Sequence, residues 1–174
     1  MTIRPLSNCG KRALALLLGL WLPTAAGAEA EGGAQFQDWT VTCAPAGAET
    51  RACALTQRLA DPSDGRFLGE VGLNPLGSGA ERRLVMVLRT PDGVLLTARP
   101  AFRVGAGEPV ALVWHSCAEA RCSALLTLEP AHITALRRGL TMVVGYQPLG
   151  RDGPVTFPVS LRGVTAGLRA LGVP

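Results

Sequence analysis

Short β-compatible runs, separated by turn residues, constrain the fold of this 174-residue chain more than any other feature of its sequence. Recognised turn chemistry interrupts the chain at 61–65 (DPSDG), 91–93 (PDG) and 150–154 (GRDGP). The runs between such breaks predict about eight strands, at 36–43, 52–59, 83–90, 93–100, 109–117, 122–128, 140–148 and 155–161. We therefore predict a mainly β fold, most simply an antiparallel β-sandwich with an immunoglobulin-like two-sheet architecture.

Two of these runs carry more detailed predictions. TPDGVLL at 90–96 predicts a tight hairpin that joins the strands on either side of it. The alternation in FQDWTVTC at 36–43 is imperfect, which predicts a bulge or burial on both faces. Trp39 in this run is expected to be a core anchor, with its ring buried against a disulfide.

Two segments break the β pattern and predict short helices. PAHITALRRG at 130–139 begins with a proline suited to a first helical turn and ends with two arginines and a glycine. One of these helices is expected to cross between the two sheets. VTAGLRALG at 164–172 predicts a further turn or two, although Gly167 weakens a helix there by about 1 kcal/mol.

The first 28 residues have the three parts of a Sec-type secretory signal peptide. A basic segment is followed by an apolar run at 13–23 and by the small residues Ala26-Gly27-Ala28. The apolar run is too short for a membrane-spanning helix, which needs about 20 residues. We predict cleavage after Ala28, a periplasmic or secreted protein, no transmembrane segment in the mature chain, and a single β-sandwich domain over 29–174. Cys9 precedes the apolar run, so it is expected to leave with the signal peptide.

Cleavage also changes the charge balance. Three of the 17 basic residues lie in the signal peptide and all 13 acidic residues follow it, so the mature chain carries 14 basic and 13 acidic residues. The arginines are scattered among carboxylates and form no basic stripe. This distribution argues against nucleic acid as a partner.

Four cysteines remain in the mature chain: Cys43, Cys53, Cys117 and Cys122. An exported chain meets an oxidising compartment, where an even set of cysteines forms disulfides. Three pairings are possible, and we favour Cys43–Cys53 with Cys117–Cys122 because each closes a short local loop. A zinc site lacks support because the chain has two histidines, and a redox pair would be expected as CxxC rather than CxxxxC.

Catalytic patterns are scarce. Ser160 lacks the G-x-S-x-G frame of a nucleophile elbow, and the adjacency of His115 and Ser116 specifies no triad geometry. His132 is expected on a helix surface. Asp61 and Asp64 lie in turn sequence, and Glu119 has no partner in the pattern. The sequence therefore predicts no catalytic, cofactor-binding or metal-binding residues.

An ordered set of motifs covers nearly all of the mature chain. FQDWTVTC, CALTQ, PDGVLLTARPAFRV, CAEARCSALLTL, LRRGLTMVV and FPVSLRGVTAGLRAL occur in this order. The set resembles the invasion-associated locus B family of exported bacterial proteins, most specifically in D-W-T-V-x-C, in the paired cysteines followed by an alanine, and in V-S-L-x-G. The chain departs from the family pattern at Arg121, where a glycine is usual, and at Val164, where a phenylalanine is usual.

The resemblance implies a periplasmic or envelope-associated β-sandwich, linked in pathogenic members to entry into host cells, and it implies no established catalytic chemistry. We therefore predict a non-enzymatic envelope protein that binds another protein or an envelope component through a sheet face or an edge strand. The alternative is a small exported hydrolase or inhibitor-like module that uses Ser116, His115 or Ser160. An enzyme would lose its activity on one polar substitution, whereas a binding module would depend on an exposed patch.

Overall fold

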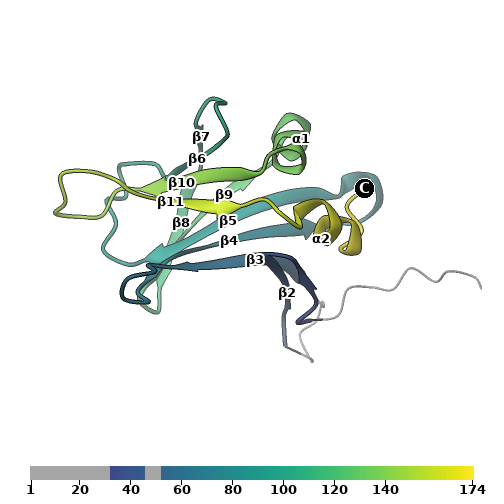
Figure 1. Cartoon of the computed structure of the whole chain (residues 1–174), viewed down its shortest axis with the longest axis horizontal. Helices are drawn as coiled ribbons and strands as arrows, with labels where there is room; N and C mark the ends of the chain where they lie inside the picture. The colour runs from purple at the N-terminus through teal and green to yellow at the C-terminus, as the bar shows by residue number, and fades with distance from the viewer. Residues whose placement is uncertain (1–31, 46–51) are drawn as a thin grey trace, which may run out of the picture.

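Antiparallel strands form two sheets in the computed structural model, which describes residues 32–45 and 52–174 (Figure 1). The prediction of a mainly β fold with two antiparallel sheets is confirmed. The predicted signal peptide at 1–28 lies outside the described residues. Among these residues, neither helix has the length and apolar character that crossing a membrane requires.

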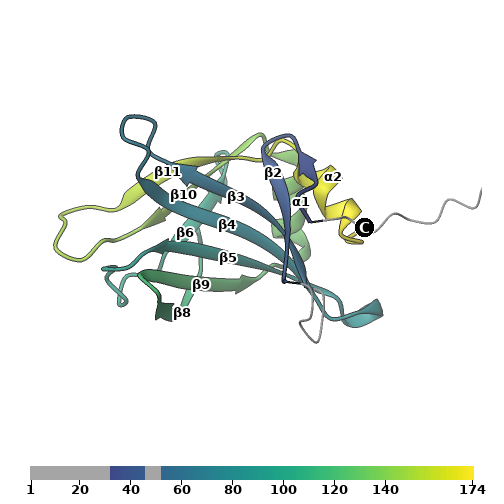
Figure 2. The same cartoon turned by 90° about the horizontal axis from the view of Figure 1, so that it is seen from below.

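The larger sheet has seven strands, and Figure 2 shows most of them side by side. Across the sheet they are β1 (Gln35–Phe36), β2 (Trp39–Cys43), β3 (Cys53–Ala60), β4 (Phe67–Leu76), β5 (Arg83–Pro91), β9 (Arg121–Thr127) and β8 (Val113–Ala118). A 3₁₀ turn at Gly79–Glu81 separates β4 from β5. Every pair is antiparallel, and β8 forms one free edge of the sheet.

The smaller sheet has four strands and forms the second layer (Figure 1). Across the sheet they are β11 (Val155–Ser160), β10 (Thr141–Tyr146), β6 (Ala101–Val104) and β7 (Val110–Ala111). Apolar side chains from both sheets join one buried cluster, which includes Leu55, Leu73, Met86, Leu88, Phe102, Met142, Val144, Phe157 and Val159. Burial of these side chains is the main force that holds the layers together.

Both predicted helices form. α1 (Pro130–Arg138) crosses from β9 in the larger sheet to β10 in the smaller one. α2 (Val164–Ala170) packs against β1, β2 and β3, and it also contacts α1. Gly167, which weakens this helix intrinsically, lies where an added Cβ would come within 2.5 Å of the Leu55 side chain. An added methyl group there would force the Leu55 side chain or α2 to shift.

The structure corrects the predicted strands in several places; the run at 109–117 is divided between β7 in the smaller sheet and β8 in the larger one, and β6 was not predicted. The run at 36–43 is not one bulged strand: β1 turns back on β2 through Gln37, whose φ is 55°, so that Phe36 pairs with Trp39. β4 was not predicted because glycine, asparagine and proline interrupt its pattern, yet neighbours on both sides hold it as a ten-residue strand.

A further correction concerns 93–100. This segment is not a strand, and TPDGVLL is not a hairpin, because the chain leaves the larger sheet after β5 and enters the smaller sheet at β6. In between it pairs with the segment that follows β10, where Val94 and Pro148 form an isolated bridge. Leu95 N donates to Gln147 O at 2.8 Å, and Leu149 N donates to Gly93 O at 2.7 Å.

Candidate functional site

The hydroxyl of Ser160 is occupied by structural hydrogen bonds. Its Oγ donates to Asp38 Oδ2 at 2.6 Å and accepts from Arg162 N at 3.2 Å. The backbone of Ser160 accepts from Trp39 Nε1 at 2.8 Å and donates to Gln57 Oε1 at 3.0 Å. Because these bonds connect β11 to β2 and β3, Ser160 holds the two sheets together, and no histidine takes part.

Neither histidine is a hydrogen-bond partner of Ser160 among the described residues. His115 and Ser116 are exposed on the edge strand β8, next to a bulge in its pairing with β9. His132 is half-buried in α1, where its Nδ1 accepts from Glu129 N at 3.2 Å and its ring packs edge-on to Phe102. His132 therefore lies partly exposed on the helix, in part as predicted, and its side chain also completes a capping box.

The predicted turn carboxylates bind their own turn. Asp61 Oδ1 accepts from Ser63 N at 2.9 Å and from Ser63 Oγ at 2.6 Å, and these bonds hold the pKa of Asp61 below its usual value. Asp64 Oδ1 accepts from Arg66 N at 2.9 Å. Both side chains shape the β3–β4 hairpin, so they make no acid–base pair.

The structure joins Cys43 to Cys53 and Cys117 to Cys122. In both bridges the two cysteines are directly opposite each other on neighbouring antiparallel strands. Trp39 is fully buried in the core. In the described part of the chain, no three His, Cys, Asp or Glu side chains gather into a group that could hold a metal ion.

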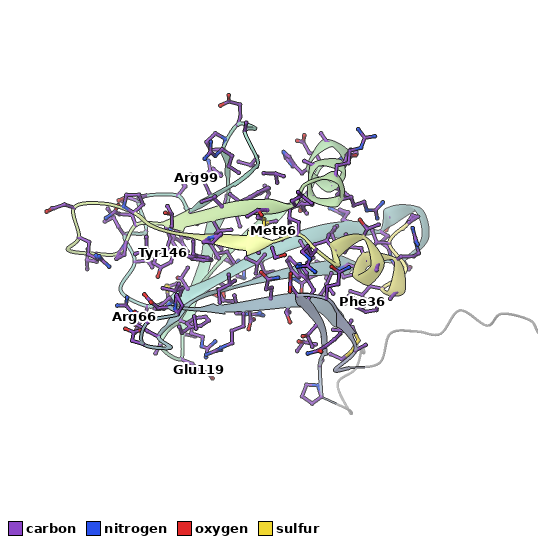
Figure 3. All side chains as sticks on the ribbon, in the orientation of Figure 1. Phe36, Arg66, Met86, Arg99, Glu119 and Tyr146 are labelled. Carbon is purple, nitrogen blue, oxygen red and sulfur yellow. A yellow bond between two sulfur atoms is a disulfide. The ribbon has the colours of Figure 1, made fainter. Side chains whose placement is uncertain are left out.

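A cleft of about 560 Å³ opens at the end of the molecule where the β3–β4, β8–β9 and β10–β11 connections meet. We call it the hairpin cleft. Its polar lining consists of Arg66, Asp92, Glu119, Arg121, Tyr146 and Arg151, and its apolar lining of Phe67, Leu68, Pro91, Ala120, Pro148 and Val155. Figure 3 shows Arg66, Glu119 and Tyr146 at this end, far from Phe36 at the other. Its size falls within the range of small-ligand sites.

One wall of the hairpin cleft is a strained turn. Glu119 and Ala120 have φ values of 52° and 58°, a left-handed conformation that side chains other than glycine rarely adopt. The Cys117–Cys122 bridge joins the two strands that flank the turn, and Asp92 N donates to Ala120 O at 3.1 Å. Backbone strain of this kind persists only where the surroundings enforce it, and it concentrates at functional sites.

Arginines surround the aromatic ring at the cleft wall. The guanidinium carbons of Arg58 and Arg121 lie 4.4 and 4.8 Å from the centroid of the Phe67 ring, within cation–π range. Arg66 Nη2 lies 3.7 Å from Asp61 Oδ2, and Arg66 Nε lies 3.9 Å from Asp64 Oδ2. Among the described residues, Arg121 and Arg151 form no ion pair. The charge of Arg121 therefore lies over the Phe67 ring, and Arg151 is exposed.

Tyr146 forms the floor of the hairpin cleft. Its side chain is only 6% exposed and packs edge-on to Phe157. Burial raises the pKa of Tyr146, while the nearby charges of Arg66 and Arg151 act in the opposite direction. Tyr146 is one of the residues that line the cleft, and its hydroxyl is not among the buried polar side-chain atoms of the described residues that lack a partner.

Sequence reasoning did not identify the hairpin cleft. Its residues come from separate segments of the chain, and no spacing in the sequence connects them. The CxxxxC stretch predicted an exposed loop, which is correct, but not that β10 and β4 contribute to the same site. The one available signal was a polar aromatic residue, Tyr146, at a strand end before a turn-rich segment.

The sequence model of the family described as "Invasion associated locus B (IalB) protein" matches residues 39–172. The chain belongs to the IalB family. The match includes both disulfides and every residue that lines the hairpin cleft. The resemblance identified from the sequence motifs is therefore confirmed.

Relatives found by sequence and by structure agree with this assignment. Invasion protein B homologs of Brucella abortus strain 2308 and of Brucella abortus biovar 1 strain 9-941 are each 27% identical over 133 residues, covering 76% of this chain and 75% of theirs. The crystal structure of invasion associated protein B from Bartonella henselae has a TM-score of 0.66 and 17% identity, covering 79% of this chain and 92% of that one. This likeness shows a shared fold.

Proposed function

We propose that this IalB-family protein is an exported binding module that acts without catalysis and holds a partner protein or an envelope component at the hairpin cleft. The observation that carries the proposal is the strained Glu119–Ala120 turn, which a disulfide and the Asp92 hydrogen bond hold against the cleft. Such a turn costs about 1 to 3 kcal/mol per residue.

The surroundings of Ser160 favour a binding function over a catalytic one. Ser160 has Asp38 as its partner but no imidazole, and its hydroxyl already makes two hydrogen bonds. Nucleophilic catalysis by serine needs a base within hydrogen-bond reach of the hydroxyl. The cleft offers arginines and a phenol, which recognise and orient a ligand. We therefore favour binding over the hydrolase alternative.

The two disulfides and the short helices fit an exported protein. Together with the sequence at 1–28, they support a periplasmic or secreted location and a mature domain over 29–174. N-terminal sequencing of the protein from the periplasmic fraction should give Glu29, or Glu31 if Ala28-Glu29-Ala30 is the cleavage site. An intact Met1 on membrane-embedded material would reject this location.

The names of the Brucella and Bartonella relatives refer to invasion. For this protein we propose the more general activity, binding at the hairpin cleft, of which attachment to a host-cell protein would be one case. Loss of host-cell entry on deletion of the gene, with recovery by the wild-type protein and not by a cleft variant, would assign that case.

The proposed function is tested by comparing captured material between matched variants. The mature, oxidised protein is immobilised and incubated with envelope extract of its native bacterium, beside Arg121→Glu in the cleft and Arg103→Glu on the exposed face of β6. A component enriched by the wild type and by Arg103→Glu, and lost with Arg121→Glu, supports the proposal. Ester or peptide hydrolysis that disappears in Ser160→Ala, with no cleft-dependent capture, would contradict it.

A further inference from the structure

We infer that two copies of this protein pair through the free edge of β8, strand to strand and antiparallel, to form a symmetric dimer. The inference goes beyond the proposed function, because no residue of β8 lines the hairpin cleft. It begins from the position of β8 (Val113–Ala118), which is the last strand of the larger sheet and pairs with β9 alone among the described strands (Figure 2). Backbone N–H and C=O groups on its other side form an open sheet edge.

The other three edges of the two described sheets carry features that oppose pairing with another chain. β1 and β7, at two of these edges, are only two residues long. β11, at the third, contains Pro158, which has no N–H to donate. β8 is six residues long, and its sequence VWHSCA has no proline and no Asp, Glu, Lys or Arg. Since short strands, prolines and charges are the usual protection of sheet edges, β8 is the least protected edge of the described residues.

Open backbone groups of β8 are located at Cys117. The Cα atoms of Cys117 and Cys122 are 4.0 Å apart across the β8–β9 ladder. Opposite residues that exchange no hydrogen bonds have Cα atoms about 4.5 Å apart, whereas hydrogen-bonded ones are about 5.5 Å apart. The N–H and C=O of Cys117 therefore point away from β9. No backbone hydrogen bond from a turn or loop of the described residues reaches them, so water or another strand has to satisfy them.

A bulge interrupts β8 without closing its edge. The pairing with β9 shifts between Trp114 and Ser116, which leaves His115 outside the ladder. The extra residue of a bulge is unpaired and bends its strand locally. Residues 116–118 follow in regular register with β9. The half of β8 beyond the bulge therefore keeps the geometry that strand pairing needs.

The composition of β8 favours a second copy as the occupant of its edge. Identical strands without charged residues can lie side by side without like-charge repulsion, and β8 offers no charge that would select a charged foreign strand. Antiparallel pairing about a two-fold axis near Ser116 brings the Val113 end of one β8 to the Ala118 end of the other. Val113 is 54% exposed in the single chain, and this pairing covers it twice.

Pairing through β8 determines where the two hairpin clefts lie in the dimer. β8 runs toward the Glu119–Ala120 turn, which lines the cleft. Because the two copies of β8 run in opposite directions, the two clefts lie toward opposite ends of the joined sheet. The dimer is therefore bivalent, and an extended partner with two binding sites gains affinity from holding both clefts.

Sedimentation equilibrium of the oxidised mature protein tests the pairing. One strand pair buries less surface than the roughly 1,200 Å² of a stable interface, so we expect a dissociation constant on the order of 100 µM. At that value, raising the protein concentration from about 20 µM to about 1 mM lowers the fraction of free monomer about fourfold. Exchange of the Cys117 amide hydrogen, followed by NMR over the same range, should slow by about the same factor.

Charge variants locate the contact on β8. Ser116 is exposed, and Ser116→Lys and Ser116→Glu each place two like charges near the axis. Each variant alone should weaken the dimer about tenfold or more, whereas an equimolar mixture of the two should associate as a heterodimer. Thr156→Lys adds the same charge at an exposed position of the edge strand β11 and should leave the dissociation constant unchanged. Urea unfolding checks that each variant is folded.

Three results would overturn the inference: a monomer at every concentration up to about 1 mM, a dimer that both Ser116 variants leave as strong as Thr156→Lys does, or exchange of the Cys117 amide that does not depend on concentration. If a Ser116 variant does not fold, amide exchange in the wild-type protein decides. A protein that stays monomeric but still loses capture of an envelope component with Arg121→Glu retains the proposed function, and only the dimer fails.

Discussion

Gly163 is the residue at which a single added methyl group should be least tolerated. It precedes α2 with a φ of 96°, and a Cβ built there would lie 1.8 Å from Phe36 O and 2.7 Å from Phe36 C. Real Cβ atoms do not approach backbone atoms so closely, so Gly163→Ala must displace β1 or the start of α2. That displacement would disturb the segment that carries the bond from Trp39 Nε1 to Ser160 O.

Gly150→Ala measures the cost of the left-handed backbone alone, without a steric clash of the added Cβ. Gly150 has a φ of 73°, and an added Cβ there meets nothing within 4 Å. Left-handed backbone costs an alanine about 1 to 2 kcal/mol, and the stiffer unfolded chain offsets about 0.4 to 1 kcal/mol of it. Gly150→Ala should therefore lower the free energy of unfolding by about 1 kcal/mol, whereas Gly163→Ala should lower it by about 4 kcal/mol or more, the range of severe core disruption.

Urea unfolding of the oxidised mature protein, followed by the fluorescence of Trp39 and Trp114, measures both variants. If the two substitutions cost the same within about 0.5 kcal/mol, the close approach of Gly163 to Phe36 is not part of the native state. The account of why a glycine ends the V-S-L-x-G motif would then be refuted.

Three further predictions concern Trp39, the two disulfides and Tyr146. Trp39→Ala should destabilise by about 3 to 5 kcal/mol in the same assay, because Trp39 is fully buried, and a loss under about 1 kcal/mol would place it at the surface. Peptide mapping without reductant should find Cys43 joined to Cys53 and Cys117 to Cys122, and Cys117→Ser with Cys122→Ser should cost about 2 kcal/mol; stoichiometric zinc or a reactive thiol there would contradict the staple. Tyr146 is the chain's single tyrosine, so absorbance at 295 nm reports it alone. Its pKa should lie above the ordinary value of 10.0, and Arg151→Gln should raise it further. Since folding favours the neutral phenol, its contribution to stability is present below pH 10 and is lost as the pH rises through the folded-state pKa. A normal pKa for Tyr146 would show that the phenol is solvated.

Local signals in the sequence were enough for some elements. α1 was predicted over 130–139 and spans Pro130–Arg138, because the proline, the basic last turn and Gly139 all act within one helix. The strands with uninterrupted β-compatible residues, such as β5 and β10, were likewise predicted close to their observed bounds. In these segments the intrinsic preference and the tertiary context agree.

Other elements depend on neighbours that are distant in sequence. β4 forms despite Gly69, Gly72 and Pro75 because β3 and β5 pair with it on both sides. Residues 93–100 are apolar enough for a strand, but the chain uses them to pass between the sheets. Tertiary pairing decided both outcomes, and no window of local sequence contains that information.

The hairpin cleft shows the same limit for a site. CAEARC predicted an exposed, closed loop, since loop closure is a local property. The meeting of that loop with Tyr146 and Arg151 follows from the sandwich topology, which brings β8–β9 and β10–β11 to one end. Arginine and tyrosine at such positions have no motif of their own. Their shared role became visible only in three dimensions.

Site-specific photo-cross-linking in the native bacterium tests the central claim, that the hairpin cleft is the binding surface, most directly. The photoreactive amino acid p-benzoylphenylalanine is placed at position 151 in the cleft and, as a control, at position 103 on the outer face of β6. The account predicts a discrete covalent adduct from position 151 that Arg121→Glu abolishes, and none from position 103. An adduct from position 103 with none from position 151 would contradict it.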